Sequence, residues 1–102
     1  MKKLLLLKHI DCKVIIAMYF KNEDQAINWW SNFIASEDWE IIHEGDRVKS
    51  NHRYRLTYSI FDDRGKLYSK YIICFSKKEA VILKQKIKKE NPNYITNIEK
   101  LY

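Results

Sequence analysis

The chain has 102 residues, of which 46% are hydrophobic and 31% charged, and its formal net charge is +6. This composition is typical of a globular protein and argues against a disordered segment. Two glycines and one proline leave no room for a flexible linker or a glycine-rich phosphate loop, and a chain of this length predicts one domain over residues 1–102.

The first stretch, residues 4–20, is predicted to be extended. Apolar residues occupy every even position from Ile10 to Phe20, and the residues between them are also fairly apolar, which indicates a central strand covered on both faces. Whether residues 4–7 continue this strand or fold back through residues 8–13 stays open.

The N-terminal run of four leucines ends at Lys8, which is too short for a secretory signal. No stretch approaches the roughly 20 apolar residues of a membrane span. We therefore expect a cytoplasmic protein that does not engage the membrane.

A helix is predicted to begin after Asn22. Asn22 and Gln25 have the spacing of a capping box, and an apolar stripe follows at helical spacing: Ala26, Ile27, Trp30, Phe33 and Ile34. Trp29 falls at the edge of this stripe, either as a half-buried margin of the core or as an exposed docking side chain. A second strand is expected over residues 37–44.

A hairpin over residues 53–75 is the best-defined predicted element. Its first arm alternates cleanly, which predicts a strand with one buried face: Tyr54, Leu56, Tyr58 and Ile60. A four-residue loop over 62–65 would pair Leu56 with Tyr71 and keep Lys70 and Cys74 away from the core. The opposite face would then collect the basic and aromatic residues: Arg53, Arg55, Lys66, Tyr68 and Lys70.

A second helix is predicted to begin after Ser76, which forms a capping box with Glu79. Its buried stripe is Ala80, Leu83 and Ile87, and Asn91-Pro92 ends it. Its opposite face carries further cations: Lys78, Lys86 and Lys89. Residues 94–102 are expected to form a last strand.

These elements predict an α+β fold of order β-α-β-β-β-α-β. Two helices would cover one face of a mixed, largely antiparallel sheet, related to the ferredoxin-like topology. A strand, a capped helix and a strand occur twice at an offset near 55 residues, which indicates either a degenerate βαβ duplication or convergence, because any helix must cover a sheet face.

The charge is distributed unevenly along the chain. Residues 1–51 hold seven Lys and Arg against eight Asp and Glu, whereas residues 52–102 hold twelve against five. This asymmetry predicts a polyanionic partner. Cations that interleave with an aromatic side chain are typical of single-stranded nucleic-acid or RNA binding. The predicted binding residues are Arg53, Arg55, Lys66, Tyr68, Lys70, Lys78, Lys86, Lys89 and Trp29.

No enzyme, metal or cofactor signature is found in the sequence. His9 and Cys12 have a ligand-like spacing, but a zinc site needs three or four convergent ligands. The protein is therefore expected to act without catalysis, metal or cofactor. Cys12 and Cys74 are expected to be buried free thiols, with a disulfide between them as the alternative.

A second hypothesis rests on composition alone. The chain has few glycines and prolines and many lysines, isoleucines and asparagines. This composition is similar to that of many small proteins of phages and mobile elements. Such a protein would be an anti-CRISPR-like inhibitor that docks on a nucleic-acid-handling protein of the host. A homodimer is also predicted, because Ile72, Ile82 and residues 4–7 lack an obvious cover.

Overall fold

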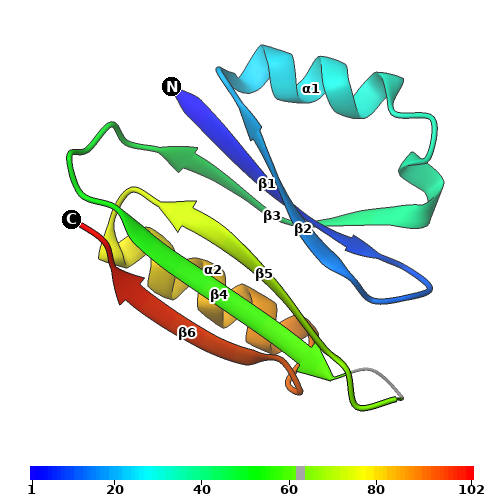
Figure 1. The fold of residues 1–102 in the computed structure, drawn as a ribbon. Helices are drawn as coiled ribbons and strands as arrows, with labels where there is room; N and C mark the ends of the chain where they lie inside the picture. The colour runs from blue at the N-terminus through cyan, green and yellow to red at the C-terminus, as the bar shows by residue number, and fades with distance from the viewer. Residues whose placement is uncertain (62–63) are drawn as a thin grey trace. The chain divides into compact units, whose positions relative to one another are not determined.

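The computed structural model describes residues 1–61 and 64–102 and shows the predicted α+β class (Figure 1). Along the described chain, the elements are β1 (Lys2–His9), β2 (Ile15–Phe20), α1 (Glu23–Asn32), a short 3-10 turn (Ser36–Asp38), β3 (Trp39–Arg47), β4 (Tyr54–Phe61), β5 (Leu67–Cys74), α2 (Lys77–Glu90) and β6 (Ile95–Lys100).

The strands form two three-stranded sheets, in the orders β2-β1-β3 and β5-β4-β6, and every pair is antiparallel. The predicted single mixed sheet is therefore wrong, and its ferredoxin-like relation is not confirmed. The main cause lies in residues 4–20, which fold back on themselves so that Leu5 pairs with Met18. Lys13 takes a positive φ of 64° in the connection, a left-handed conformation that reverses the chain there.

The chain divides into two units, Met1–Val48 (unit 1) and Lys49–Tyr102 (unit 2). Each unit has the order ββαβ, with its first strand in the centre of its sheet. The repeated unit is therefore ββαβ instead of the predicted βαβ. The prediction of one domain over residues 1–102 stays a prediction.

Both helices begin with the predicted capping box, and the two boxes are 54 residues apart. Asn22 Oδ1 and Ser76 Oγ accept hydrogen bonds from the backbone N–H groups of Gln25 and Glu79, at 2.8 and 3.1 Å. The Gln25 and Glu79 side chains in turn accept from the backbone N–H groups that precede each cap, at 2.8 and 3.2 Å. This reciprocal pattern satisfies amides that an uncapped helix would leave exposed.

In unit 1, α1 packs against β1 and β2. One core cluster consists of Leu5, Leu7, Phe20 and Ala26, and Leu4, Leu6 and Ile15 are buried as well. The predicted α1 stripe is only partly correct, because Ile27 is exposed and Ile34 is 97% exposed. The physical reason is that α1 ends at Asn32, so Ile34 falls beyond the last helical turn.

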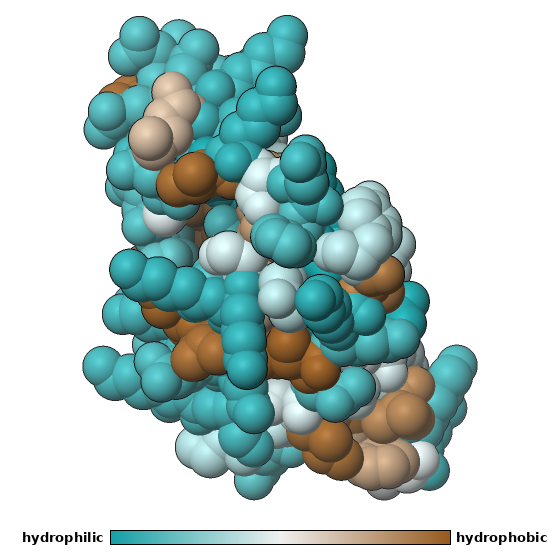
Figure 2. All heavy atoms as spheres, turned by 90° about the vertical axis from the view of Figure 1, so that its left-hand side faces the viewer, coloured by the Kyte–Doolittle hydropathy of each residue, from teal (hydrophilic) through white to brown (hydrophobic). Residues whose placement is uncertain are grey.

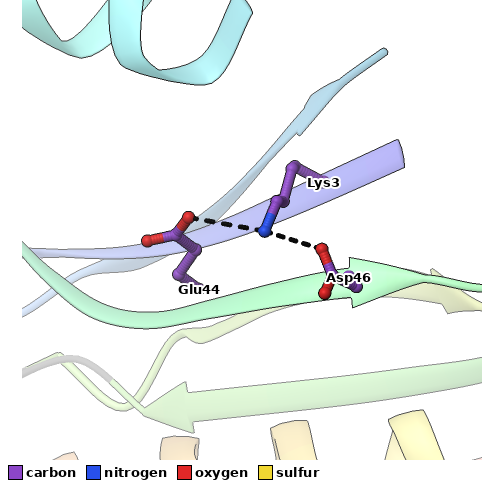
Figure 3. Close-up of polar contacts among 3 residues, drawn as sticks. All are labelled: Lys3, Glu44 and Asp46. Carbon is purple, nitrogen blue, oxygen red and sulfur yellow. Dashed lines mark ion pairs between the residues drawn. The ribbon is translucent and has the colours of Figure 1, made fainter. Parts of the chain in front are cut away.

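An ion-pair cluster joins the central strand of unit 1 to β3 (Figure 3). Lys3 Nζ lies 2.6 Å from Asp46 Oδ1 and 3.7 Å from Glu44 Oε1. The hydrogen bond to Asp46, followed by the charges of Asp46, Glu23 and Glu44, holds the pKa of Lys3 above its ordinary value. Lys3 is therefore charged across the physiological pH range and links two neighbouring strands.

In unit 2, α2 buries the predicted stripe Ala80, Leu83 and Ile87. It contacts all three strands of its sheet and lies behind β4 in Figure 1. The covered sheet face includes Leu56, Tyr58, Ile72 and Cys74. Tyr94, which follows α2, places its ring edge-on against Tyr58 with centroids 5.7 Å apart, and this contact identifies the face on which α2 lies.

The β4–β5 register differs by one residue from the predicted one. Leu56 pairs with Ile72 instead of Tyr71, and Tyr58 pairs with Lys70. Because side chains alternate along a strand, this shift turns every β5 side chain to the opposite face. Ile72 and Cys74 therefore point to the α2 side and are completely buried. The predicted loop over 62–65 includes residues 62 and 63, which lie outside the described part of the chain.

Cys12 is exposed in the connection between β1 and β2, and Cys74 is buried; both are free thiols. The prediction of two buried thiols is thus correct only for Cys74. Hydrophilic side chains cover most of the side shown in Figure 2, and hydrophobic patches lie between them. No helix among the described residues is long and apolar enough to cross a membrane.

Candidate functional site

The β5 register brings three of the predicted binding residues to the sheet face that α2 covers. Tyr68 pairs with Ile60 and Lys70 with Tyr58, so both point to the side of α2. Tyr68 is 53% exposed, and Lys66 Nζ lies 5.5 Å from the centre of its ring. α2 therefore does not extend over this part of β5, and Lys70 reaches solvent although it points to the helix side of the sheet.

The flank of α2 that faces β5 follows from the chain path. β5 and β6 run in the same direction, and a right-handed crossover through α2 connects them. With 100° between successive residues, Lys86 lies about 90° from the buried stripe on the flank toward β5, and Lys89 follows it on the outer side of the helix, at about 150°. Lys84 and Lys88 lie on the flank toward β6. The Lys88 ammonium donates to the backbone oxygen of Tyr94 at the start of β6, at 2.9 Å, which agrees with this assignment.

Five residues thus form one surface, which we name the basic strip: Lys66, Tyr68, Lys70, Lys86 and Lys89. Lys70 and Lys89 are exposed and Lys86 is half-buried. Within residues 1–61 and 64–102, the side chains of Lys70, Lys86 and Lys89 form no ion pair. Their charges are consequently available to a ligand.

Lys78 lies in the first turn of α2, on the outer side of the helix opposite the buried stripe. It is eight residues before Lys86, which corresponds to about 12 Å along the helix. It therefore lies apart from the basic strip, toward the other end of α2.

The two arginines of the hairpin lie elsewhere, which corrects the predicted five-residue face. Arg55 points to the sheet face opposite α2 and pairs with Glu99. The Arg53 guanidinium donates to the backbone oxygens of Ser50 and His52 and lies 4.4 Å from the centre of the Phe75 ring. Both cations are already engaged by these partners. Arg55 and Lys70 lie on opposite faces because the one-residue shift turned the side chains of β5 and left those of β4 in place.

Trp29 belongs to unit 1. Its ring stacks on Phe33 with centroids 4.7 Å apart and contacts Phe20 at 5.5 Å. Trp29 is half-buried. This burial agrees with the first of its two predicted roles, a half-buried margin of the core.

Sequence reasoning missed a group of uncharged residues beside Trp29. Gln25, Asn28 and Asn32 line one hollow together with Trp29 and Phe33. The signal was present in the sequence: three amide side chains at positions i, i+3 and i+7 share one flank of a helix.

The described residues contain no group of three His, Cys, Asp or Glu side chains arranged as metal ligands. No protein-family model, curated protein or solved structure matches this chain.

Proposed function

We propose that unit 2 binds single-stranded nucleic acid or RNA through the basic strip, without catalysis. The observation that carries this proposal is the β4–β5 register, in which Tyr68 and Lys70 point to the sheet face that α2 covers. Cations on two elements can follow a row of phosphates, and an exposed aromatic ring between them can stack on a base.

The charge of unit 2 supports the same ligand. Lys49–Tyr102 holds thirteen Lys and Arg against five Asp and Glu, a formal charge of +8, whereas Met1–Val48 holds six against eight, a charge of −2. A polyanion is therefore attracted to unit 2 specifically. Among the described residues, Lys70, Lys86 and Lys89 of the basic strip form no ion pair that would compete with that polyanion.

The test measures the affinity for a labelled single-stranded oligonucleotide as a function of salt. Each phosphate contact to a single strand contributes about 0.7 to the slope of log affinity against log salt. The double variant Lys86→Ala/Lys89→Ala should therefore lose about 1.4 units of slope and bind more weakly.

The matched control is Lys77→Ala/Lys84→Ala, which removes the same charge from the other flank of the same helix. It should bind nearly as tightly as the original protein, with only the small loss of affinity that a lower net positive charge causes. Equal losses in the two double variants, or an affinity independent of salt, would refute the proposal.

A second candidate function is docking on a protein, in line with the anti-CRISPR-like hypothesis. The sheet face of unit 2 opposite α2 carries four large apolar side chains that are at least half exposed: Phe61, Leu67, Tyr71 and Ile95. Contiguous exposed apolar surface is typical of protein interfaces. In this case a nucleic-acid-handling protein should be captured by the chain even after nuclease treatment, and Phe61→Ser/Tyr71→Ser should abolish the capture.

A further inference from the structure

An open hollow on unit 1 lies along one flank of α1 and the residues that follow it. Its volume is about 580 Å³, within the range typical of ligand sites. The lining residues share one property, the absence of any formal charge: Gln25, Asn28, Trp29, Asn32, Phe33, Ile34 and Ala35. A ligand of this hollow is therefore uncharged where it binds.

Aromatic rings supply a flat, rigid wall. Trp29 and Phe33 stack with only 25° between their planes, and Phe20 packs against Trp29 at a tilt of 49°. Ile34 stands at the rim with 97% of its surface exposed. Planar rings stack well on such a wall, since every nucleobase presents a π-face.

The three amides supply hydrogen-bonding groups of both kinds. Gln25 Oε1 is engaged by the backbone N–H of Lys21, and Asn32 Nδ2 donates to the backbone oxygen of Asn28, each at 2.8 Å. These bonds orient the two amides. They leave Gln25 Nε2 as a donor and Asn32 Oδ1 as an acceptor without another partner among residues 1–61 and 64–102.

One residue of the hollow has a counterpart in the basic strip of unit 2. With the 54-residue offset of the capping boxes, Asn32 corresponds to Lys86, whereas Lys89 has no counterpart in α1, which ends at Asn32. The equivalent flanks of the two helices thus differ in chemistry: that of α2 is cationic, and that of α1 is aromatic and amide-bearing.

We propose that the hollow beside α1 binds a nucleobase ring, which stacks against the Trp29–Phe33 pair while its edge bonds to Gln25 and Asn32. Flat heterocycles that carry both donors and acceptors are the class of ligand that satisfies these groups together, and Asn and Gln are well suited to pair with base edges. This inference rests on the proposed function, because it assigns a separate site to the uncharged part of the same ligand.

The experiment uses nucleosides, which carry a base but no phosphate. Adenosine, cytidine, guanosine and uridine are titrated into the full chain while the indole N–H resonances of Trp29, Trp30 and Trp39 are followed by NMR. The Trp29 resonance should shift in a saturable manner, at least one nucleoside should bind with an affinity independent of salt, and Trp39 should serve as an internal reference.

Variants separate the amides from simple apolar binding. Asn32→Ala, which removes one of the two amides proposed to bond the base edge, should weaken nucleoside binding by about fivefold or more, whereas Ser31→Ala, on the other flank of α1, should leave it unchanged. Phenol, a planar ring without the base edge, should bind more weakly than every nucleoside that shifts Trp29.

Absence of a Trp29 shift with all four nucleosides, or equal binding of phenol, would overturn the inference. The salt-dependent oligonucleotide test with Lys86→Ala/Lys89→Ala does not involve α1. Failure of one proposal can therefore be told from failure of the other.

Discussion

Leu56 lies directly opposite Ile72 in the β4–β5 hairpin, and both side chains are completely buried. This one pairing determines which side chains of β5 enter the core and which residues accompany Lys70 on the α2 side. The surface proposed to bind nucleic acid depends on it, because the neighbouring register would place Tyr68 and Lys70 on the opposite face.

Thiol labelling tests this register directly. Cys74 should be unreactive in the native protein because it is buried, whereas exposed Cys12 should react at once. One thiol per chain should therefore react quickly, and the second only after unfolding. Cys12→Ser should remove the fast reaction; a remaining fast thiol would place Cys74 on the open face.

Two adjacent isoleucines provide a second test by stability. Ile72 has no exposed surface, so Ile72→Ala should lower the free energy of unfolding by about 2–5 kcal/mol. Ile73 is only half-buried, so Ile73→Ala should cost clearly less. Urea denaturation measures both, and the reverse ranking would contradict the observed pairing.

Two tyrosines on opposite faces of β5 test the stacking role. Tyr68→Ala should weaken oligonucleotide binding by about 1–3 kcal/mol, with an unchanged salt slope, because stacking releases no counterions. Tyr71→Ala removes a ring that is even more exposed from the other face and should have little effect. Binding isotherms at three salt concentrations distinguish the two.

The stability of unit 1 should depend on alkaline pH through Lys3. Its pKa is raised above the ordinary value of 10.5, first by the hydrogen bond to Asp46. The contribution to stability is therefore fully present below pH 10.5 and is lost as the pH rises through the higher folded-state pKa. Relative to Lys3→Met, the original protein should lose its advantage in urea midpoint above pH 10.5. Lys2→Met, a change at the exposed neighbouring lysine, should show no such convergence.

The homodimer stays a prediction, and the structure offers a surface for it. The apolar side chains opposite α2, among them Phe61 and Tyr71, could pair with a second copy of the same face. Light scattering at high micromolar concentration should give twice the chain mass, and Phe61→Ser/Tyr71→Ser should return the mass to that of a monomer. A monomer mass for the original protein would reject the dimer.

The sequence by itself determined the local features of this protein. Both capping boxes and the stripe of α2 were predicted and are confirmed. The predicted inward face of β4 is confirmed at Leu56 and Tyr58, whereas Tyr54 and Ile60 are half-buried and Ser59 on the other face is buried. Each depends on interactions within one helical turn or along one strand, so the residues that decide it are close together in the sequence.

Only the tertiary structure decided the register of β5 and the division into two sheets. Along β5, Leu67, Tyr71 and Ile73 offer one apolar face, and Tyr68, Ile72 and Cys74 offer another, so alternation alone does not choose between them. The choice came from packing: the register that buries Ile72 and Cys74 under α2 leaves Lys70 on the same face but exposed. A lysine on the helix side of a sheet lowers the stability of the fold only where the helix shields its charge from water. How far the helix extends over the sheet is a property of the folded chain.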